Sequence, residues 1–202
     1  FELETFLPFQ LEELLIDFSM AEGKSGPLSD VVAIAVKKEF VARRLSLFPT
    51  ERIDPNVLDI DSLVLGNALA ITNDTEDQIV AVLDLGHKKS GLAIFRNGQP
   101  LAMRTFLGGG KAVTDLLRVD LDLTFQQAEQ VKHKYSTIRA AADPVKDKQQ
   151  EKISRCITTA LEPMVLEVHR TLHNFETSSQ YGKIDRLYIC GGTSLIRGID
   201  SY

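Results

Sequence analysis

The sequence of 202 residues contains no tryptophan and only two cysteines, Cys156 and Cys190, which lie far apart. Two isolated thiols exclude the dense disulfide framework of a small secreted domain, and they predict reduced core cysteines in a reducing cytoplasm. No stretch approaches the roughly 18 apolar residues that a membrane-spanning helix needs. The opening FELETFLPFQ lacks an initiator Met and the charge-then-apolar order of a secretory signal, so we expect the sequence to be a fragment.

Dense basic clusters are also missing. The chain has 23 Lys and Arg against 28 Asp and Glu, a formal net charge of -5. Because nucleic acids and anionic membranes attract a concentrated positive patch, this distribution argues against both as partners. Hydrophobic residues at 44% and charged residues at 25% are ordinary for a globular protein, and 202 residues can bury a full core. The composition therefore predicts one large domain or two small ones.

The first third of the chain alternates strand and helix patterns. VVAIAV at 31–36 is a continuous β-branched run, which is typical of a strand covered on both faces. It leads into KKEFVARRLSLF, where apolar residues recur at helical spacing, and Asp61 is placed to cap a helix over SLVLGNALAI. The polar segment TNDTED at 72–77 lacks apolar periodicity and is the best candidate for a subdomain boundary.

Three strands are predicted next, at 78–85, 91–96 and 101–107. Asn97-Gly98 lies between the last two strands. This dipeptide predicts a tight hairpin, because both of its residues tolerate positive φ.

Helices are predicted for most of the remaining chain. KAVTDLLRV and FQQAEQVKHKY have helical spacing, and Thr124 precedes the second as its N-cap. The polar link AAADPVKDKQQE leads to a long amphipathic helix at 152–175, which Pro163 should kink. KIDRLYICGGTSLIRGI then reads as a strand, a double-glycine turn and the start of a helix. Strand clusters followed by helices occur twice, which indicates two related α/β halves.

Asp84-Leu85-Gly86 is the first candidate site, because it stands at the end of an apolar strand, where ligands collect in α/β sheets. A carboxylate there can hold Mg²⁺ or its waters, and a glycine lets backbone N–H groups approach a phosphate. A plain turn at the strand end is the commoner interpretation of this motif alone.

Two further motifs have both a functional and an ordinary interpretation. GGTS at 191–194 follows a strand and opens a helix, which suits adenine, ribose or phosphate, but a tight strand-to-helix turn explains it equally well. Glu129 and Lys132 lie three apart on one helical face. They form either an exposed ion pair or a pair of ribose contacts.

The histidines indicate little. His169 and His173 lie four apart on a predicted helix and could bind a metal through one face. The sequence offers no evident third ligand, so a solvated or partly buried pair is the ordinary interpretation. No nucleophile elbow or Ser-His-Asp order stands out.

The order of these motifs resembles the second half of the actin-like ATPase fold, which actin, FtsA, the heat-shock chaperones and sugar kinases share. In detail the chain is similar to PilM-type pilus assembly proteins and the related GspL-type secretion proteins. The blocks that carry the resemblance run in the family's order over nearly the whole chain: LPFQLEELLIDF, VVAIAVKKEFVARRL, IDPNVLDIDSLVLGNAL, DLGHKKSGLAIFRNGQPLAMRTFLGGG, QAEQVKHKY and GGTSLIRGID.

The resemblance implies an α/β protein with an incomplete actin-like, ribonuclease H-like fold and a small inserted α+β subdomain. It places the inserted subdomain at 1–36, the remainder of the first actin-like subdomain at 37–76, and the second subdomain, C-terminally incomplete, at 77–202.

The resemblance also implies a nucleotide site for ATP and Mg²⁺ in the full-length protein. Asp84, Gly86 and Ser90 would lie on the second phosphate hairpin, Glu129 and Lys132 on the ribose contacts, and Gly191, Gly192 and Ser194 on the adenosine turn, with Asp84 holding Mg²⁺ through water. The turn here is His87-Lys88-Lys89 where actin has a second glycine, so the backbone is less free to wrap a phosphate. The family's first phosphate loop precedes the stretch given, so we do not expect this chain alone to hydrolyse ATP.

The function that follows is a cytoplasmic actin-like scaffold of a type IV pilus or type II secretion platform, associated with the inner membrane through partners. It would dock the cytoplasmic tail of an inner-membrane protein and, in a further interaction, a motor ATPase. A nucleotide-binding actin-like ATPase or kinase is the alternative, as is an FtsA-like division protein. A homodimer through exposed sheet edges is left open.

Overall fold

The chain folds into two compact units, 1–61 and 62–202. A computed structural model describes residues 7–20, 31–48, 55–72, 75–138 and 147–202. The three subdomains expected from the resemblance, with borders at 36/37 and 76/77, stay predictions.

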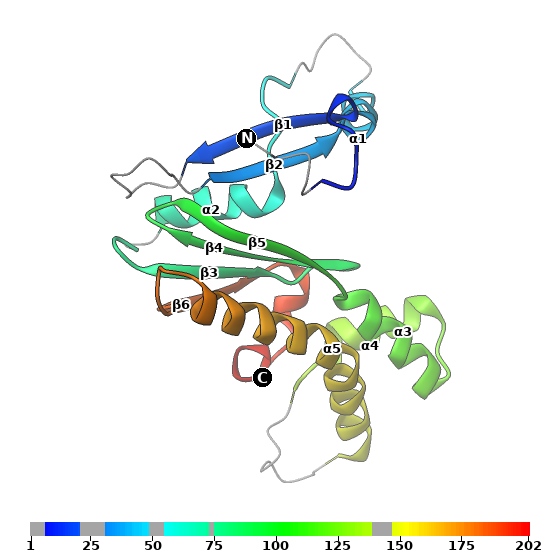
Figure 1. Cartoon of the computed structure of the whole chain (residues 1–202). Coiled ribbons are helices and arrows are strands. Elements are labelled where there is room, and N and C mark those ends of the chain that lie inside the picture. Colours follow the sequence, from blue (N-terminus) through cyan, green and yellow to red (C-terminus); the bar gives the residue numbers. More distant parts are fainter. Residues whose placement is uncertain (1–6, 21–30, 49–54, 73–74, 139–146) are drawn as a thin grey trace. The chain divides into compact units, whose positions relative to one another are not determined.

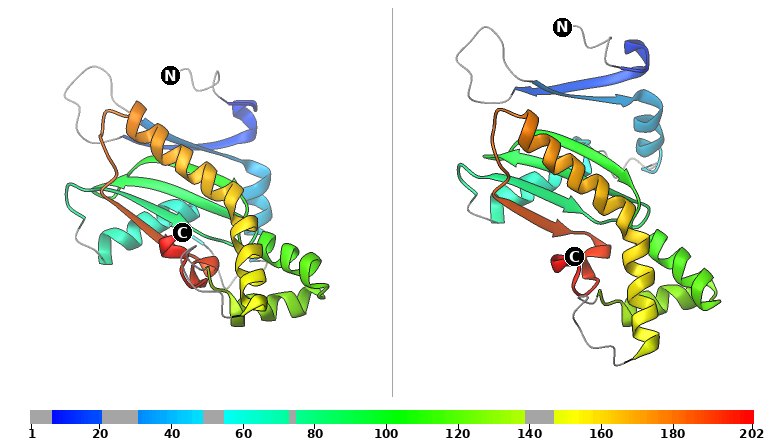
Figure 2. Two further views of the ribbon diagram at one scale, coloured as in Figure 1. Left: turned by 90° about the horizontal axis from the view of Figure 1, so that it is seen from below. Right: turned by 60° about the horizontal axis from the view of Figure 1, so that its bottom comes forward.

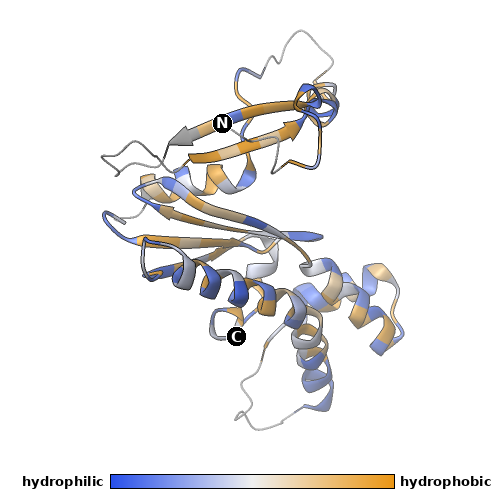
Figure 3. Ribbon diagram, viewed as in Figure 1, coloured by the Kyte–Doolittle hydropathy of each residue, from blue (hydrophilic) through white to orange (hydrophobic). Residues whose placement is uncertain are grey.

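The first unit contains an antiparallel strand pair, β1 (Leu14–Met20) and β2 (Val31–Lys37), after a short 3-10 turn, η2 (Leu11–Glu13). Helix α1 (Lys38–Leu45) continues directly from β2, which confirms the predicted strand-to-helix order (Figure 1). Both strands are apolar (Figure 3), but Leu14 is the one buried residue among those described in this unit. The predicted coverage of both faces of 31–36 is therefore wrong for the described part of the unit, where β2 is only partly buried.

The second unit is built on a sheet of four strands in the order β5-β4-β3-β6. Its strands are β3 (Ile79–Asp84), β4 (Lys89–Arg96), β5 (Gln99–Leu107) and β6 (Arg186–Cys190). The first three form an antiparallel meander, and Asn97 and Gly98 connect β4 to β5 with φ of 50° and 76°, which confirms the predicted hairpin. β6 runs parallel to β3, so the carboxyl ends of these two strands meet at one edge of the sheet.

Helices cover both faces of this sheet (Figures 1 and 2). Helix α2 (Asp61–Thr72) packs Leu69 against Val80 and Val82 of β3, whereas α5 (Lys148–Ser178) packs on the face formed by Ala81 and Leu83. Alternate residues of one strand therefore supply two hydrophobic layers, as the period of two in a strand requires. Asp61 is the first residue of α2 rather than a cap that precedes it.

The predicted helix at 111–119 is confirmed as α3 (Gly110–Leu121), and that over FQQAEQVKHKY as α4 (Phe125–Tyr135). Thr124 caps α4 as predicted, with Gln127 completing a reciprocal capping box. Asp147 caps α5 by accepting from the Gln149 N–H at 2.8 Å. The end of the predicted polar link is therefore the first turn of α5, and 139–146 lies outside the described residues. α5 contains Pro163 and bends along its length (Figure 2).

Both cysteines are free, as the sequence predicts. Burial and a 3.3 Å hydrogen bond to Asp120 raise the pKa of the Cys156 thiol to about 11. That thiol is therefore protonated and unreactive at neutral pH. Within the ranges that the structure describes, no helix is long and apolar enough to cross a membrane.

Candidate functional site

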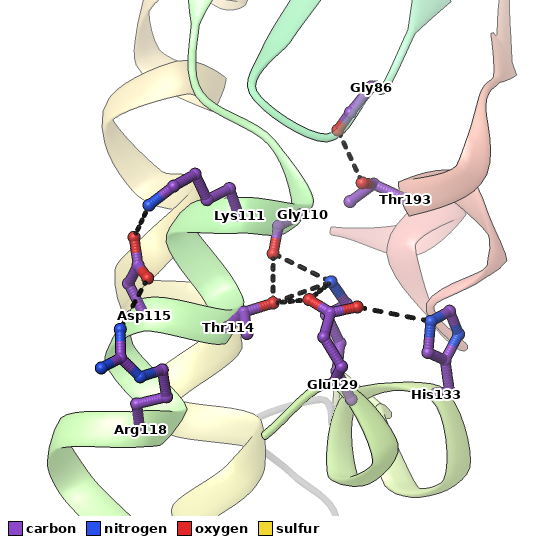
Figure 4. Close-up of polar contacts among 10 residues, drawn as sticks. Gly86, Gly110, Lys111, Thr114, Asp115, Arg118, Glu129, His133 and Thr193 are labelled. Carbon is purple, nitrogen blue, oxygen red and sulfur yellow. Dashed lines mark hydrogen bonds and ion pairs between the residues drawn. The ribbon is translucent and has the colours of Figure 1, made fainter. Parts of the chain in front are cut away.

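The parallel pairing of β3 with β6 brings two of the predicted motifs together. Asp84 lies opposite Cys190, and the Leu85 N–H donates to the Cys190 carbonyl at 2.9 Å. Thr193 then bonds to the first motif twice, through its N–H to Leu85 O at 2.9 Å and its hydroxyl to Gly86 O at 2.8 Å (Figure 4). The turn after β3 and the double-glycine turn after β6 therefore form one structure, although Gly86 and Thr193 are 107 residues apart in sequence.

Gly191 is required where the two turns meet. Its φ of 88° with ψ of 166° is a conformation that side chains rarely adopt, and a Cβ there would lie 2.3 Å from Asp84 Oδ1. The Asp84 carboxylate makes no hydrogen bond or ion pair within the described ranges, and its charge together with burial raises the pKa of the Cys190 thiol, burial having the larger effect. Asp84 is thus a carboxyl group without a partner among the described residues, at the edge where β3 and β6 end.

The glycines that follow β5 pack against the Asp84-Leu85-Gly86 motif. The Gly110 N–H donates to Gly86 O at 3.0 Å, and a Cβ on Gly109 would lie 2.2 Å from the same oxygen. Ser90, only 2% exposed, donates its hydroxyl to Gly108 O at 3.1 Å. In this structure the Ser90 hydroxyl therefore supports the glycine loop, which consists of Gly108, Gly109 and Gly110.

Glu129 and Lys132 form an ion pair at 2.6 Å with side chains only 23% and 11% exposed, so the exposed surface pair is excluded. Lys132 also donates to Thr114 Oγ1 at 2.8 Å and to Gly110 O at 3.1 Å. The Thr114 hydroxyl contacts Glu129 Oε1 as well (Figure 4). The Glu129–Lys132 pair of α4 is therefore hydrogen-bonded to the first turn of α3.

The electrostatic balance at Glu129 favours its charged form. Burial acts to raise the pKa of this carboxyl, but hydrogen bonds from Lys132 and Thr114, together with the charges of Lys132 and His87, lower it overall. Glu129 is therefore an anion whose charge is offset by neighbouring donors.

A cavity of about 230 Å³ opens between α4 and the segment after β6. Its lining comprises His87, Glu129, Lys132, His133, Lys134, Ser136, Gly192, Thr193, Leu195, Ile196 and Arg197. The charged side chains are three cations and one carboxylate, with two histidines beside them, so the cavity suits an anion that also presents hydroxyl groups. Three of the eight predicted site residues, Glu129, Lys132 and Gly192, line it.

The other five predicted residues do not line the cavity. Gly86 and Gly191 shape the backbone, as described above. Ser194 donates its hydroxyl to Gly191 O at 2.7 Å and so stabilises the double-glycine turn.

Ser136 is a cavity residue that sequence reasoning missed. It is 8% exposed, and its hydroxyl oxygen has no hydrogen-bond partner among the described residues. A buried polar group without a partner calls for a ligand or water. Its sequence signal, a serine just beyond the helix end, is too common to have identified it. Thr114 was missed as well, because its contacts to Glu129 and Lys132 are made only in the folded chain. Thr193 stands in the predicted GGTS motif, but its bonds to Leu85 and Gly86 could not be predicted from the sequence.

His169 and His173 stack with ring centroids 6.5 Å apart. Over the parts of the chain that the structure describes, no three His, Cys, Asp or Glu side chains are arranged to hold a metal ion. A magnesium ion at Asp84 would need waters or phosphate oxygens for its remaining ligands.

Solved structures with the same fold include a PilM-PilN type IV pilus biogenesis complex, with a TM-score of 0.78 and 27% identity, covering 99% of this chain and 55% of that one. MreB5 of Spiroplasma citri bound to ADP matches with a TM-score of 0.63 and 18% identity, covering 83% of this chain and 57% of that one. EutJ of Carboxydothermus hydrogenoformans matches with a TM-score of 0.50 and 24% identity, covering 69% and 43%. The chain thus spans about half the length of these proteins.

These matches confirm the predicted α/β actin-like fold, incomplete in this chain. Below 25% identity, the matches to MreB5 and EutJ carry the fold alone. The sequence profile of the type IV pilus assembly protein PilM matches all of residues 1–202. The chain therefore belongs to the PilM family of type IV pilus assembly proteins.

Proposed function

We propose that the protein is an actin-like scaffold of the type IV pilus assembly platform and docks the cytoplasmic tail of an inner-membrane partner. The observation that carries this is the match, at 27% identity over 99% of the chain, to a solved PilM-PilN type IV pilus biogenesis complex. Family and structure both favour the pilus machine over type II secretion. In this proposal the protein is cytoplasmic and reaches the inner membrane through its partner, and contacts with a motor ATPase or a second copy are further proposals.

A pulldown tests the scaffold proposal. The protein, immobilised, is offered the cytoplasmic tails of the inner-membrane components of the pilus and of type II secretion, with scrambled tails of equal charge as controls. We expect a pilus tail to be retained and its scrambled version to be lost. Retention of secretion tails alone would assign the other machine, and retention of no tail would remove the docking function.

The cavity beside α4 supports a second candidate function, the binding of an adenine nucleotide with Mg²⁺. The resemblance assigns Glu129 and Lys132 to the ribose and Gly191, Gly192 and Ser194 to the adenosine. In support, Glu129, Lys132 and Gly192 line one cavity, and Gly191 and Ser194 belong to the turn beside Gly192. Asp84 is free to hold a Mg²⁺ ion through water, while Gly86 and Ser90 set the backbone of the phosphate hairpin. The unpaired Ser136 hydroxyl is a further polar group for the ligand.

Calorimetry with ATP tests nucleotide binding, with and without Mg²⁺. We expect Asp84→Ala to weaken binding only when Mg²⁺ is present, and Ser136→Ala to weaken it in both conditions. Asp77→Ala is the matched control, since Asp77 pairs with Arg96 at the far end of the β4–β5 hairpin. Absence of any heat at millimolar ATP would remove this function and leave the scaffold proposal standing.

A further inference from the structure

Thr114 carries a buried hydroxyl that contacts both Glu129 and Lys132 of α4. The residue is 0% exposed, and Figure 4 shows its oxygen between Gly110 and Glu129. It donates to either the Gly110 carbonyl, at 2.9 Å, or Glu129 Oε1, and it accepts from Lys132 Nζ at 2.8 Å. A hydroxyl has one proton, so it serves one of these two acceptors at a time.

The donors of Lys132 are fully used in this arrangement. An ammonium group has three N–H bonds, and here they have three acceptors, namely Gly110 O, Thr114 Oγ1 and Glu129 Oε1. A ligand in the cavity could take a hydrogen bond from Lys132 only after one of these was broken. Breaking one would weaken the attachment of α4 to the glycine loop, so direct contact between Lys132 and a ligand is disfavoured.

The two carboxylate oxygens of Glu129 differ in the hydrogen-bond donors that lie near them. Oε1 lies within hydrogen-bonding reach of both Lys132 Nζ and the Thr114 hydroxyl, whereas among the described residues the polar contact of Oε2 is His133 Nε2, at 3.4 Å. The His133 side chain is 75% exposed and lines the cavity. Oε2 is therefore the oxygen with unused acceptor capacity.

We propose that Thr114 and Lys132 are positioning residues, which hold Glu129 through Oε1 so that Oε2 accepts a hydrogen bond from a hydroxyl of the ligand. This inference rests on the proposed nucleotide binding, in which that hydroxyl is one of the ribose pair. It differs from the expectation by resemblance, which places Glu129 and Lys132 equally on the ribose. Thr114 acts through Glu129 and does not touch the ligand.

Three threonine variants test the proposal. Thr114→Val removes the hydroxyl at constant shape, and Thr114→Ser restores it. Thr158→Val is the matched control, because the Thr158 hydroxyl donates to a backbone carbonyl of its own helix, Arg155 O at 3.0 Å or Ser154 O at 3.3 Å, and it does not line the cavity. If Thr114→Val does not fold, Thr114→Cys takes its place, since a thiol is a much weaker donor.

The first measurement is a carbon-13 NMR titration of the Glu129 carboxyl without nucleotide. We expect the pKa of Glu129 to rise in Thr114→Val, to return in Thr114→Ser, and to stay unchanged in Thr158→Val. The second is the ratio of affinities for ATP and its 2′- and 3′-deoxy analogues. We expect a preference for ATP over one analogue that falls about tenfold in Thr114→Val and is restored in Thr114→Ser, the effect of losing one hydrogen bond to a charged group.

The outcomes separate this inference from the function on which it rests. An unchanged Glu129 pKa and an unchanged ratio in Thr114→Val, with ATP still bound, would overturn the positioning role. If the unmodified protein binds no nucleotide, both the nucleotide-binding function and the contact of Glu129 with a ribose are excluded. The titration of Glu129 still decides whether Thr114 holds this carboxyl group.

Discussion

Gly191 and Gly192 are neighbours in sequence but differ in what they require. A Cβ on Gly191 would meet Asp84 Oδ1 at 2.3 Å and Leu85 O at 2.6 Å, whereas a Cβ on Gly192 would meet nothing within 4 Å. The backbone of Gly191 is also in a region that only glycine adopts readily. The first glycine therefore fixes the joint between two strand ends, and the second leaves space at the cavity.

Replacing each glycine with alanine tests this difference. We expect Gly191→Ala to lower the free energy of unfolding by about 2 kcal/mol or more, from backbone strain and displacement of Asp84. Gly192→Ala should change it by less than about 0.5 kcal/mol. Urea denaturation of the two variants measures both values, and equal losses would contradict this account of the turn.

Glu129 should also affect the stability of the folded protein at low pH. Because the pKa of Glu129 in the folded protein is below its ordinary 4.5, the unfolded chain takes up a proton first as pH falls. The stability that Glu129 contributes is thus complete well above pH 4.5 and is lost as pH falls through its lowered pKa in the folded state. We expect the urea midpoint of the unmodified protein to fall more steeply below pH 4.5 than that of Glu129→Gln. Parallel curves for the two proteins would exclude this contribution.

At the scale of elements, the strand pair of the first unit stands out. β1 and β2 form an isolated two-stranded sheet, a structure that is marginal in water without cover. Leu15, Ile16 and Phe18 of β1 are 48%, 41% and 63% exposed. From the exposed apolar side chains on this marginal sheet we predict that β1 and β2 are stabilised by the partner of the scaffold proposal.

Hydrogen exchange measures this dependence. We expect the amides of β1 and β2 to exchange faster than those of β3 and β4, which have buried side chains on both faces. Adding the partner tail of the scaffold proposal should slow β1 and β2 and leave β3 and β4 as they are. Exchange in β1 as slow as in β3 without any partner would show that the hairpin needs no cover.

At the scale of the whole molecule, the two units differ in how much they bury. The second has hydrophobic clusters on both faces of its sheet, while the described part of the first buries Leu14 alone. Because stability follows buried apolar area, the second unit should be the more persistent.

Limited proteolysis followed by mass spectrometry tests this asymmetry. We expect early cleavage within 1–61 and a resistant fragment that begins near residue 62. A scaffold whose first unit is ordered by its partner should lose this early cleavage when the tail is present. Simultaneous loss of both units would instead indicate one cooperative structure.

Local chemistry explains which features could be predicted from the sequence. Asn97-Gly98 specifies its hairpin because only residues that accept positive φ fit there, and Thr124 specifies a helix start because its hydroxyl satisfies a free N–H. The strands β3 to β6 and the helices α3 to α5 follow from apolar periodicity in the same way. Glu129 and Lys132 were found because a spacing of three places them on one helical face.

Tertiary structure decided the rest, because it joins residues that no local pattern relates. Thr114 lies fifteen residues before Glu129 in the sequence, and only the packing of α3 against α4 brings these two side chains into contact. Ser136 became a candidate because folding buries its hydroxyl without a partner, and Gly191 became essential because β6 lies beside β3. The elements and the residues that end them could be predicted from the sequence, since they depend on backbone conformations and hydrogen bonds made by near neighbours. The cavity, the charge state of Glu129 and the bonds that hold it were decided only by contacts between distant segments.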